Sequence, residues 1–317
     1  MRNLMKAALA AAALTIAPSG AALADGHGWQ PEGPIDLIIA FRAGGGADTS
    51  GRLIADQMQE ATGWEIIPRQ VTGGGGVNAL VELQDLPADG TAIALVVTES
   101  LGYNAASSPD AGVSPDSVTG LTTTAGFQMG IVSQSSMGWE SFQDVIDAAQ
   151  GGAELRFGAM SPKLADLAFL LGEANGVEFN IIEVRGGRAV LDGVTAGDMD
   201  LGFMAGIQGR GVASGDLVNL ASALSVPLVQ TPEAPTMADL GVEFTADGYF
   251  VFVAPPGLPD DAREALTAAI VEASNSGAAQ EMIGNAFGGT VNIQGDELDT
   301  LLSDDFNAAG ALMEAAQ

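Results

Sequence analysis

The chain has 317 residues, 47% of them apolar and 16% charged, which is enough to fill the core of one large domain or two medium ones. Forty acidic residues against 11 basic ones give a formal net charge of -29. This balance excludes nucleic acid and anionic lipid surfaces as partners, because both are recognised by basic patches. The absence of cysteine excludes disulfides, zinc thiolate sites and cysteine nucleophiles. The single histidine, His27, excludes multi-histidine metal sites and disfavours a histidine-based triad, so we expect neither metal nor cofactor.

The first 24 residues have the pattern of a secretory signal peptide. Arg2 and Lys6 precede a short apolar run at 7–17, and Ala22-Leu23-Ala24 has the small-x-small cleavage pattern. The apolar run is shorter than the roughly 20 residues that span a membrane, which argues against an anchor. We therefore expect export and cleavage after Ala24. The mature chain would keep 9 basic and 40 acidic residues, a net charge of -31.

The first part of the mature chain alternates short β-branched runs with helical patterns. Residues 35–41 are predicted to form a buried strand, followed by glycines at 44–46 and a helix that begins near Asp48 and ends at Gly63. A weaker strand at 65–71, a four-glycine loop at 73–76, a helix and a strand at 91–98 come next. This order predicts right-handed crossovers and a largely parallel sheet.

The middle of the chain repeats this alternation. A strand at 155–159 precedes Ser161-Pro162, which is typical of a helix start, and Gly176 supplies a left-handed stop. The later elements are predicted in order as a strand at 179–184, a helix at 189–196, strands at 199–204, 217–224 and 249–254, and a helix from 259–260.

Four predicted strands end in a glycine- or serine-bearing loop that leads into a helix, at 44–48, 73–77, 159–163 and 185–189. In a parallel sheet these loops gather at the carboxyl ends of the strands, where backbone N-H groups and helix dipoles can hold an anion. Arg42, Lys163, Arg185 and Arg188 lie in or beside these loops. For Arg188 a surface position and a site position are equally open, and Arg52 is expected to pair with Asp48 or Asp56 on an exposed helix face.

Two other classes of protein compete with an anion-binding protein. Gly74, Gly76 and Ala79 satisfy G-x-G-x-x-A, and Glu99 follows about 20 residues later, so an exported α/β enzyme with a nucleotide at 74–79 is one alternative. A structural or adhesive surface protein is the other. No G-x-S-x-G, S-x-x-K or H-E-x-x-H motif is present, so no hydrolytic signature supports an enzyme.

Taken in order, the loops resemble a known family. The segment at 38–48, with Gly51-Arg52 after it, is similar to the first strand, loop and helix of the substrate-binding proteins of tripartite tricarboxylate transporters, the Bug family. Five further matches follow over nearly the whole mature chain, at 73–76, 87–91, 185–187 with 197–200, 234–236 with 239–241, and 254–259.

The resemblance implies an α/β periplasmic binding protein of the two-lobed, type II-like flytrap class, each lobe a mostly parallel sheet flanked by helices. It implies a first lobe at 25–126 plus 249–317 and a second at 127–248. It also implies a monomer that is not an enzyme and that passes a small carboxylate to membrane transporter subunits. Loops 42–48 and 73–76 would hold one carboxylate, and residues of the second lobe would approach from the other side. The implied ligand-binding residues are Phe41, Arg42, Gly44, Gly45, Gly46, Asp48, Gly74, Gly75, Gly76, Thr98, Ser161, Lys163, Arg185, Gly186, Gly187, Ala205 and Tyr249.

Three basic residues depart from the family pattern. Arg42 stands where a small residue is common, Lys163 lies in a stretch that is usually glycine-rich, and Arg185 lies near the place of a tyrosine. We take these as specificity-determining positions. The hypothesis is that Arg42, Lys163 and Arg185 bind a second negative group, so that the ligand is a di- or tricarboxylate or another oxyanion.

Overall fold

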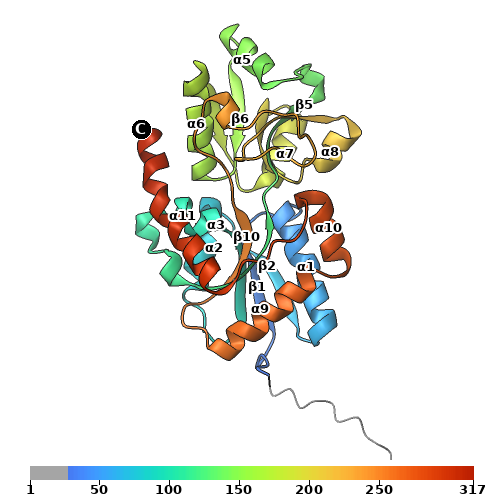
Figure 1. Cartoon of the computed structure of the whole chain (residues 1–317), viewed down its shortest axis with the longest axis vertical. Coiled ribbons are helices and arrows are strands. Elements are labelled where there is room, and N and C mark those ends of the chain that lie inside the picture. The colour runs from blue at the N-terminus through green and yellow to red at the C-terminus, as the bar shows by residue number, and fades with distance from the viewer. Residues whose placement is uncertain (1–27) are drawn as a thin grey trace, which may run out of the picture.

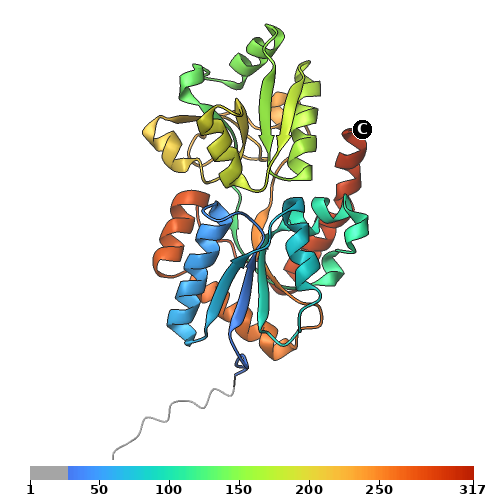
Figure 2. The same cartoon turned by 180° about the vertical axis from the view of Figure 1, so that it is seen from behind.

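A computed structural model describes residues 28–317, which fold around two five-stranded sheets. Helices cover both faces of each sheet, which gives two α/β lobes stacked along the long axis of the molecule (Figure 1; Figure 2). The predicted signal peptide at 1–24 and His27 lie outside the described residues. The two-lobed α/β fold expected from the sequence is confirmed.

The first lobe is built on a sheet with strand order β2-β1-β3-β10-β4. β1 pairs in parallel with β2 and β3, whereas β10 runs antiparallel to β3 and β4. The strands are β1 (Ile35–Ile39), β2 (Ile66–Gln70), β3 (Ala92–Val97), β4 (Thr119–Gly126) and β10 (Tyr249–Ala254).

The side chains of β1 alternate between two helical layers. Ile35, Leu37 and Ile39 pack with the apolar faces of α1 (Gly46–Thr62), α9 (Asp260–Ser274) and α10 (Gly277–Phe287). Ile38 and Ala40 pack on the opposite face with α2, α3, α4 and α11. These four helices are α2 (Val77–Leu83), α3 (Thr98–Leu101), α4 (Tyr103–Ala106) and α11 (Gly295–Ala315). A strand that is buried on both faces has a continuous run of apolar residues, which is why the sequence at 35–41 predicts a buried strand.

The second lobe is built on a sheet with strand order β7-β6-β8-β5-β9. β6 is parallel to β7 and β8, and β5 is antiparallel to β8 and β9. The strands are β5 (Met129–Gln134), β6 (Leu155–Ala159), β7 (Phe179–Glu183), β8 (Leu201–Ala205) and β9 (Leu217–Ser222). The helices are α5 (Phe142–Gln150), α6 (Pro162–Asn175), α7 (Gly187–Ala196) and α8 (Gly209–Ser214).

Several helix boundaries lie at the capping residues that the sequence predicts. Ser161 caps α6, its hydroxyl accepting a hydrogen bond from the Leu164 N-H at 3.3 Å, and Pro162 is the first helical residue. Gly63 after α1 and Gly176 after α6 are left-handed, with φ of 74° and 64°.

Both sheets are more mixed than the expected largely parallel ones. The chain passes between the sheets twice, between Gly126 and Met129 and between Ser222 and Tyr249. The strands that follow these crossings, β5 and β10, enter their sheets from the opposite lobe and therefore run against their neighbours. The lobe boundaries at 126/127 and 248/249 stay a prediction.

The C-terminal helix α11 begins against the first sheet and reaches the side of the second lobe near α6 (Figure 1). Within residues 28–317 no helix combines the length and the apolar character that crossing a bilayer requires.

Candidate functional site

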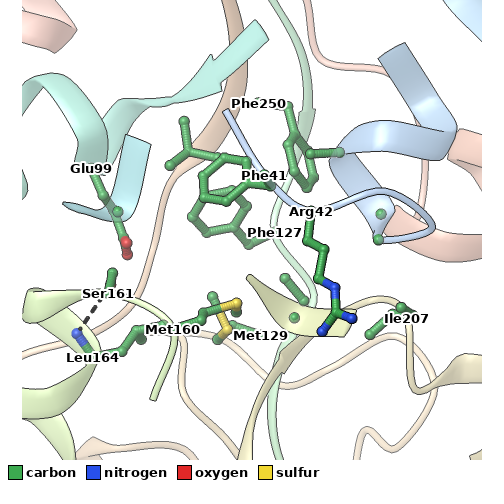
Figure 3. Close-up of a pocket in the computed structure, with 17 residues that line it drawn as sticks. Phe41, Arg42, Glu99, Phe127, Met129, Met160, Ser161, Leu164, Ile207 and Phe250 are labelled. Atoms are coloured by element: carbon green, nitrogen blue, oxygen red, sulfur yellow. Dashed lines mark hydrogen bonds between the residues drawn. The ribbon is translucent and has the colours of Figure 1, made fainter. Parts of the chain in front are cut away.

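A cavity lies between the lobes, at the carboxyl ends of β1 and β3 and facing the second sheet (Figure 3). The space between its walls, counting the part open to solvent, is about 570 Å³. Its walls are formed by Phe41, Arg42, Gly45, Gly46, Ala47, Gly75, Val97, Glu99, Phe127, Met129, Met160, Ser161, Leu164, Gly187, Ala205, Ile207 and Phe250.

The loop between β1 and α1 is organised by Asp48. This carboxylate is 5% exposed and accepts hydrogen bonds from the Gly44 N-H at 2.8 Å, Arg52 Nε at 2.7 Å and Gln70 Nε2 at 2.5 Å. The Arg52–Asp48 ion pair expected from the sequence is therefore present. Asp48 and Gly44 do not line the cavity, and Asp48 acts instead by holding the loop. The loop presents the start of α1, whose first N-H groups have no carbonyl partner within the helix.

The four-glycine loop folds into a single turn at Gly74–Gly76, which only glycine can adopt without strain. Gly73, Gly74, Gly75 and Gly76 all have positive φ. Among these Gly75 alone lines the cavity, and its carbonyl accepts hydrogen bonds from Ser100 Oγ at 2.7 Å and Asn104 Nδ2 at 3.2 Å.

Two loops of the second lobe close on these glycines. Ser161 faces Gly75, since a Cβ on Gly75 would lie 3.0 Å from the Ser161 Cβ. Gly186 packs against the other glycine loop, because a Cβ at this position would lie 3.4 Å from the Arg42 nitrogen. Ser161 and Gly187 line the cavity, whereas Gly186 does not. The structure thus brings all four predicted loops together.

Only one of the three basic residues proposed to read a second negative group lines the cavity. Arg42 does so and forms no ion pair within residues 28–317. Lys163 is turned toward Glu99, with its Nζ 3.5 Å from Glu99 Oε1. Arg185 is exposed and away from the cavity, and Arg188 pairs with Asp192 at 2.7 Å on the surface. A spacing of basic residues along the chain cannot show which way their long side chains point.

Thr98 and Tyr249 also lie outside the cavity. The Thr98 hydroxyl accepts a hydrogen bond from the Tyr249 N-H at 3.2 Å, which ties the end of β3 to the second crossing. Tyr249 borders a separate cavity at the crossings, together with Phe127 and Phe287. Among the predicted residues Ala205 does line the inter-lobe cavity, and Gly74 and Gly76 only shape their loop.

Glu99 is the main polar residue that the sequence did not assign to this cavity. It is 4% exposed, and burial raises the pKa of its carboxyl, against the opposing effect of the Lys163 ammonium. Asp305 lies close enough to raise the pKa of Glu99 further, and burial raises the pKa of Asp305 as well. A buried acid with a raised pKa in a cavity wall marks this end of the cleft as a candidate ligand contact.

An apolar wall forms the centre of the cavity. Phe127 and Phe250 make an edge-on aromatic pair with ring centroids 5.3 Å apart, and Phe41 lines the same cavity (Figure 3). Met129, Met160 and Ile207 face them from the second lobe. Phe250 stands on β10, and Phe127 and Met129 flank the first crossing. Their positions at strand ends are the one feature of the sequence that could have indicated a role in the cavity. An aromatic residue at a strand end is equally typical of the hydrophobic core.

The lobes touch through a set of cross-cleft contacts between α4 and α6. The Tyr103 hydroxyl donates a hydrogen bond to the Asp166 carboxylate. Asn104 Oδ1 accepts one from the Lys163 N-H at 3.3 Å. Together with the Glu99–Lys163 pair, these contacts describe a closed arrangement of the two lobes.

Comparison with known proteins agrees with this architecture. The family described as "Tripartite tricarboxylate transporter family receptor" matches residues 50–317. Protein BugT of Bordetella pertussis is 28% identical over 260 residues, 78% of each chain. The structure of the periplasmic binding protein BugD aligns with a TM-score of 0.79 at 18% identity, covering 90% of this chain and 98% of that one. MatC from Rhodopseudomonas palustris, solved with bound malate, aligns with a TM-score of 0.78 at 17% identity, covering 91% and 100%.

The family match covers well over half of the chain and includes the loops of the second lobe that line the cleft. Glu99, which completes the nucleotide motif in the sequence, lies in the wall of the cleft between the lobes. The chain therefore belongs to the receptors of the tripartite tricarboxylate transporter family, which are solute-binding proteins, and the alternative of a nucleotide-dependent enzyme is wrong.

Proposed function

We propose that this receptor captures a small organic carboxylate between its lobes in the periplasm and delivers it, as a monomer, to the membrane subunits of a tripartite tricarboxylate transporter. The observation that carries the proposal is the meeting of four loops around one cavity, with Arg42 in its wall and without an ion-pair partner among the described residues. The malate bound to MatC supports a carboxylate as the class of ligand.

The chemistry of the Arg42 end suits a carboxylate. Gly45, Gly46 and Ala47 bring the start of α1 to the cavity, and Gly187 brings the start of α7 from the other lobe. Helix N-termini favour anions because their N-H groups are free to donate and their dipoles are positive at that end. A guanidinium adds charge-assisted hydrogen bonds that act within a few ångströms. A carboxylate bound here would link the two lobes and stabilise the closed arrangement.

The negative net charge of the protein does not prevent a carboxylate from binding at the Arg42 end of the cavity. Of the acidic residues within 28–317 only Asp48 and Glu99 are buried, and salt screens exposed charges separated by more than about 8 to 10 Å. The predicted second negative group on the ligand would depend on Arg42 alone, since Lys163 and Arg185 are directed elsewhere.

The proposal is tested by a thermal-shift screen over organic acids, followed by calorimetry with the best ligand. We expect one ligand per chain and no turnover. A ligand at 100 times its dissociation constant should add about 2.7 kcal/mol to the free energy of unfolding. Failure of every carboxylate to raise the melting temperature of the mature chain would overturn the proposal.

Delivery is tested separately. Membrane vesicles that contain the candidate transporter subunits should take up the identified acid only when the receptor is added. Uptake that proceeds equally well without the receptor would contradict the delivery step and leave solute binding intact.

A further inference from the structure

The inter-lobe cavity has two chemically different ends. In Figure 3 Arg42 and Glu99 lie on opposite sides of Phe41 and Phe127. One end thus carries a cation beside backbone N-H groups, the middle is aromatic, and the other end carries a carboxyl group. The inference below rests on the proposed function and concerns what the ligand must present to the second end.

The carboxyl group at the second end has an unused hydrogen-bonding position. Glu99 Oε1 is buried and accepts no hydrogen bond within residues 28–317. Its nearest cation, the Lys163 Nζ, lies at 3.5 Å, which is an ion-pair contact rather than a hydrogen bond. A buried acceptor without a donor is unfavourable by itself, so a donor supplied by the ligand would satisfy it. Glu99 lines the cavity and Lys163 does not, so the Glu99 carboxyl group is part of the wall that a ligand meets.

A second carboxylate on the ligand fits this end poorly. It would meet Glu99 directly and would also feel Asp305, whose carboxyl influences Glu99. Like charges at short range in a desolvated site raise the free energy of binding, and Lys163 already faces Glu99. The centre of the cavity is equally unsuited to a highly polar molecule, because Phe127, Phe250 and Met129 would leave its polar groups without partners.

We propose that the natural ligand is an amphipathic monocarboxylate: its carboxylate lies at the Arg42 end, its apolar body packs on Phe41, Phe127 and Phe250, and a hydroxyl or amino group at its far end donates to Glu99. This order of groups matches the order of partners along the cavity. The proposal narrows the substrate class from carboxylates in general to those with an apolar body and a distal donor.

The experiment uses two matched series that change only the distal group. One is benzoate, 4-hydroxybenzoate and benzene-1,4-dicarboxylate, and the other is hexanoate, 6-aminohexanoate and adipate. Each is titrated into the mature protein by calorimetry. In each series we expect the donor-bearing acid to bind most tightly and the dicarboxylate most weakly. In Glu99→Gln, the advantage of the donor-bearing acid over its unsubstituted parent should shrink about tenfold, the usual effect of losing a hydrogen bond to a charged group.

Asp166→Asn serves as the matched control. It alters a cross-cleft contact without touching the cavity, so it should weaken all members of a series by the same factor. If Glu99→Gln does not fold, the ranking in the unmodified protein still decides. Tightest binding of the dicarboxylate in both series, or of malate above all six acids, overturns this inference and leaves the proposed function standing. Binding of no carboxylate at all overturns both.

Discussion

Tyr103 and Asp166 join the two lobes directly, the phenol of the first donating to the carboxylate of the second across the cleft. Burial and this hydrogen bond raise the pKa of Tyr103, so the phenol keeps its proton at any pH near neutrality. The closed arrangement therefore has a contact that does not depend on bound ligand. The contribution of the Tyr103 hydrogen bond to closure can be measured by mutation. Tyr249, the only other tyrosine of the chain, provides the control.

Tyr103→Phe should favour the open arrangement. Loss of one hydrogen bond is worth about 1 kcal/mol, so the apparent affinity for any carboxylate ligand should fall about fivefold through the smaller closed population. Small-angle X-ray scattering should show a larger radius of gyration in the absence of ligand. Tyr249→Phe, which removes a hydroxyl at the crossings, is the control and should leave both quantities unchanged. Equal behaviour of the two variants would remove the cross-cleft role of Tyr103.

Arg42→Gln should weaken carboxylate binding by more than tenfold with little change in the free energy of unfolding. The reason is that the Arg42 guanidinium lines the cavity and has no ion-pair partner among the described residues. Arg185→Gln is the comparison, since Arg185 is exposed outside the cavity. We expect its dissociation constant to change less than twofold. Similar losses in both variants, measured by calorimetry, would instead support the original assignment of Arg185 as a ligand reader.

Gly46→Ala should impair closure. A Cβ at this position would lie 3.1 Å from Phe287 Cζ and 3.3 Å from the Ala205 carbonyl oxygen, which belongs to the opposite lobe. We expect about a tenfold loss of ligand affinity.

Gly284→Ala is the matched control for Gly46→Ala, because Gly284 lies within α10 and has open space around its Cβ position. It should be neutral for binding and stabilise the fold by up to about 1 kcal/mol through helix propensity. Unchanged affinity in Gly46→Ala would mean that the lobes close differently around a ligand.

The titration of Glu99 predicts a pH dependence of stability. Because burial raises the pKa of this carboxyl above its ordinary value of 4.5, the folded state holds the proton more tightly than the unfolded state. Stability from Glu99 is then present at low pH and is lost as the pH rises through the folded pKa. Relative to Glu99→Gln, the unmodified protein should become less stable between pH 4.5 and neutrality.

Asp144→Asn serves as a comparison, because Asp144 is expected to change stability with pH in the opposite direction to Glu99. Hydrogen bonds from the Glu140 and Ser141 N-H groups lower the pKa of Asp144, so its stabilising effect is lost as the pH falls. Chemical denaturation of the three proteins across pH 3.5 to 7.5 gives both slopes. A Glu99 slope of the same sign as that of Asp144 would show that folding lowers the pKa of Glu99, contrary to the effect of burial.

The elements of the fold were largely predictable because their signals are local. The apolar run that forms β1, Ser161 before α6 and Gly63 after α1 each specify their structure through neighbouring residues. β4 and β5 were not predicted: Thr122, Thr123 and Thr124 interrupt the apolar pattern, although the sheet buries them. The antiparallel direction of β5 and β10 follows from the two crossings, which no local pattern encodes.

The sequence predicted which loops form the candidate site. It did not predict which side chains of those loops line the cavity. Glycine loops at strand ends must converge in a parallel arrangement, and they do. The directions of Arg185 and Lys163 could not be foreseen, because long side chains choose among partners in three dimensions. Glu99 attracted attention through a nucleotide motif, yet its surroundings depend on Ser161 and Asp305, which are distant in sequence.

Phe127 forms part of the wall of the inter-lobe cavity and of the cavity at the crossings. The two spaces are therefore not independent volumes. A rotation of this one ring that enlarges the inter-lobe cavity would reduce the space beside the crossings. A substitution of Phe127 is therefore expected to alter the ligand space and the surroundings of the two crossings together.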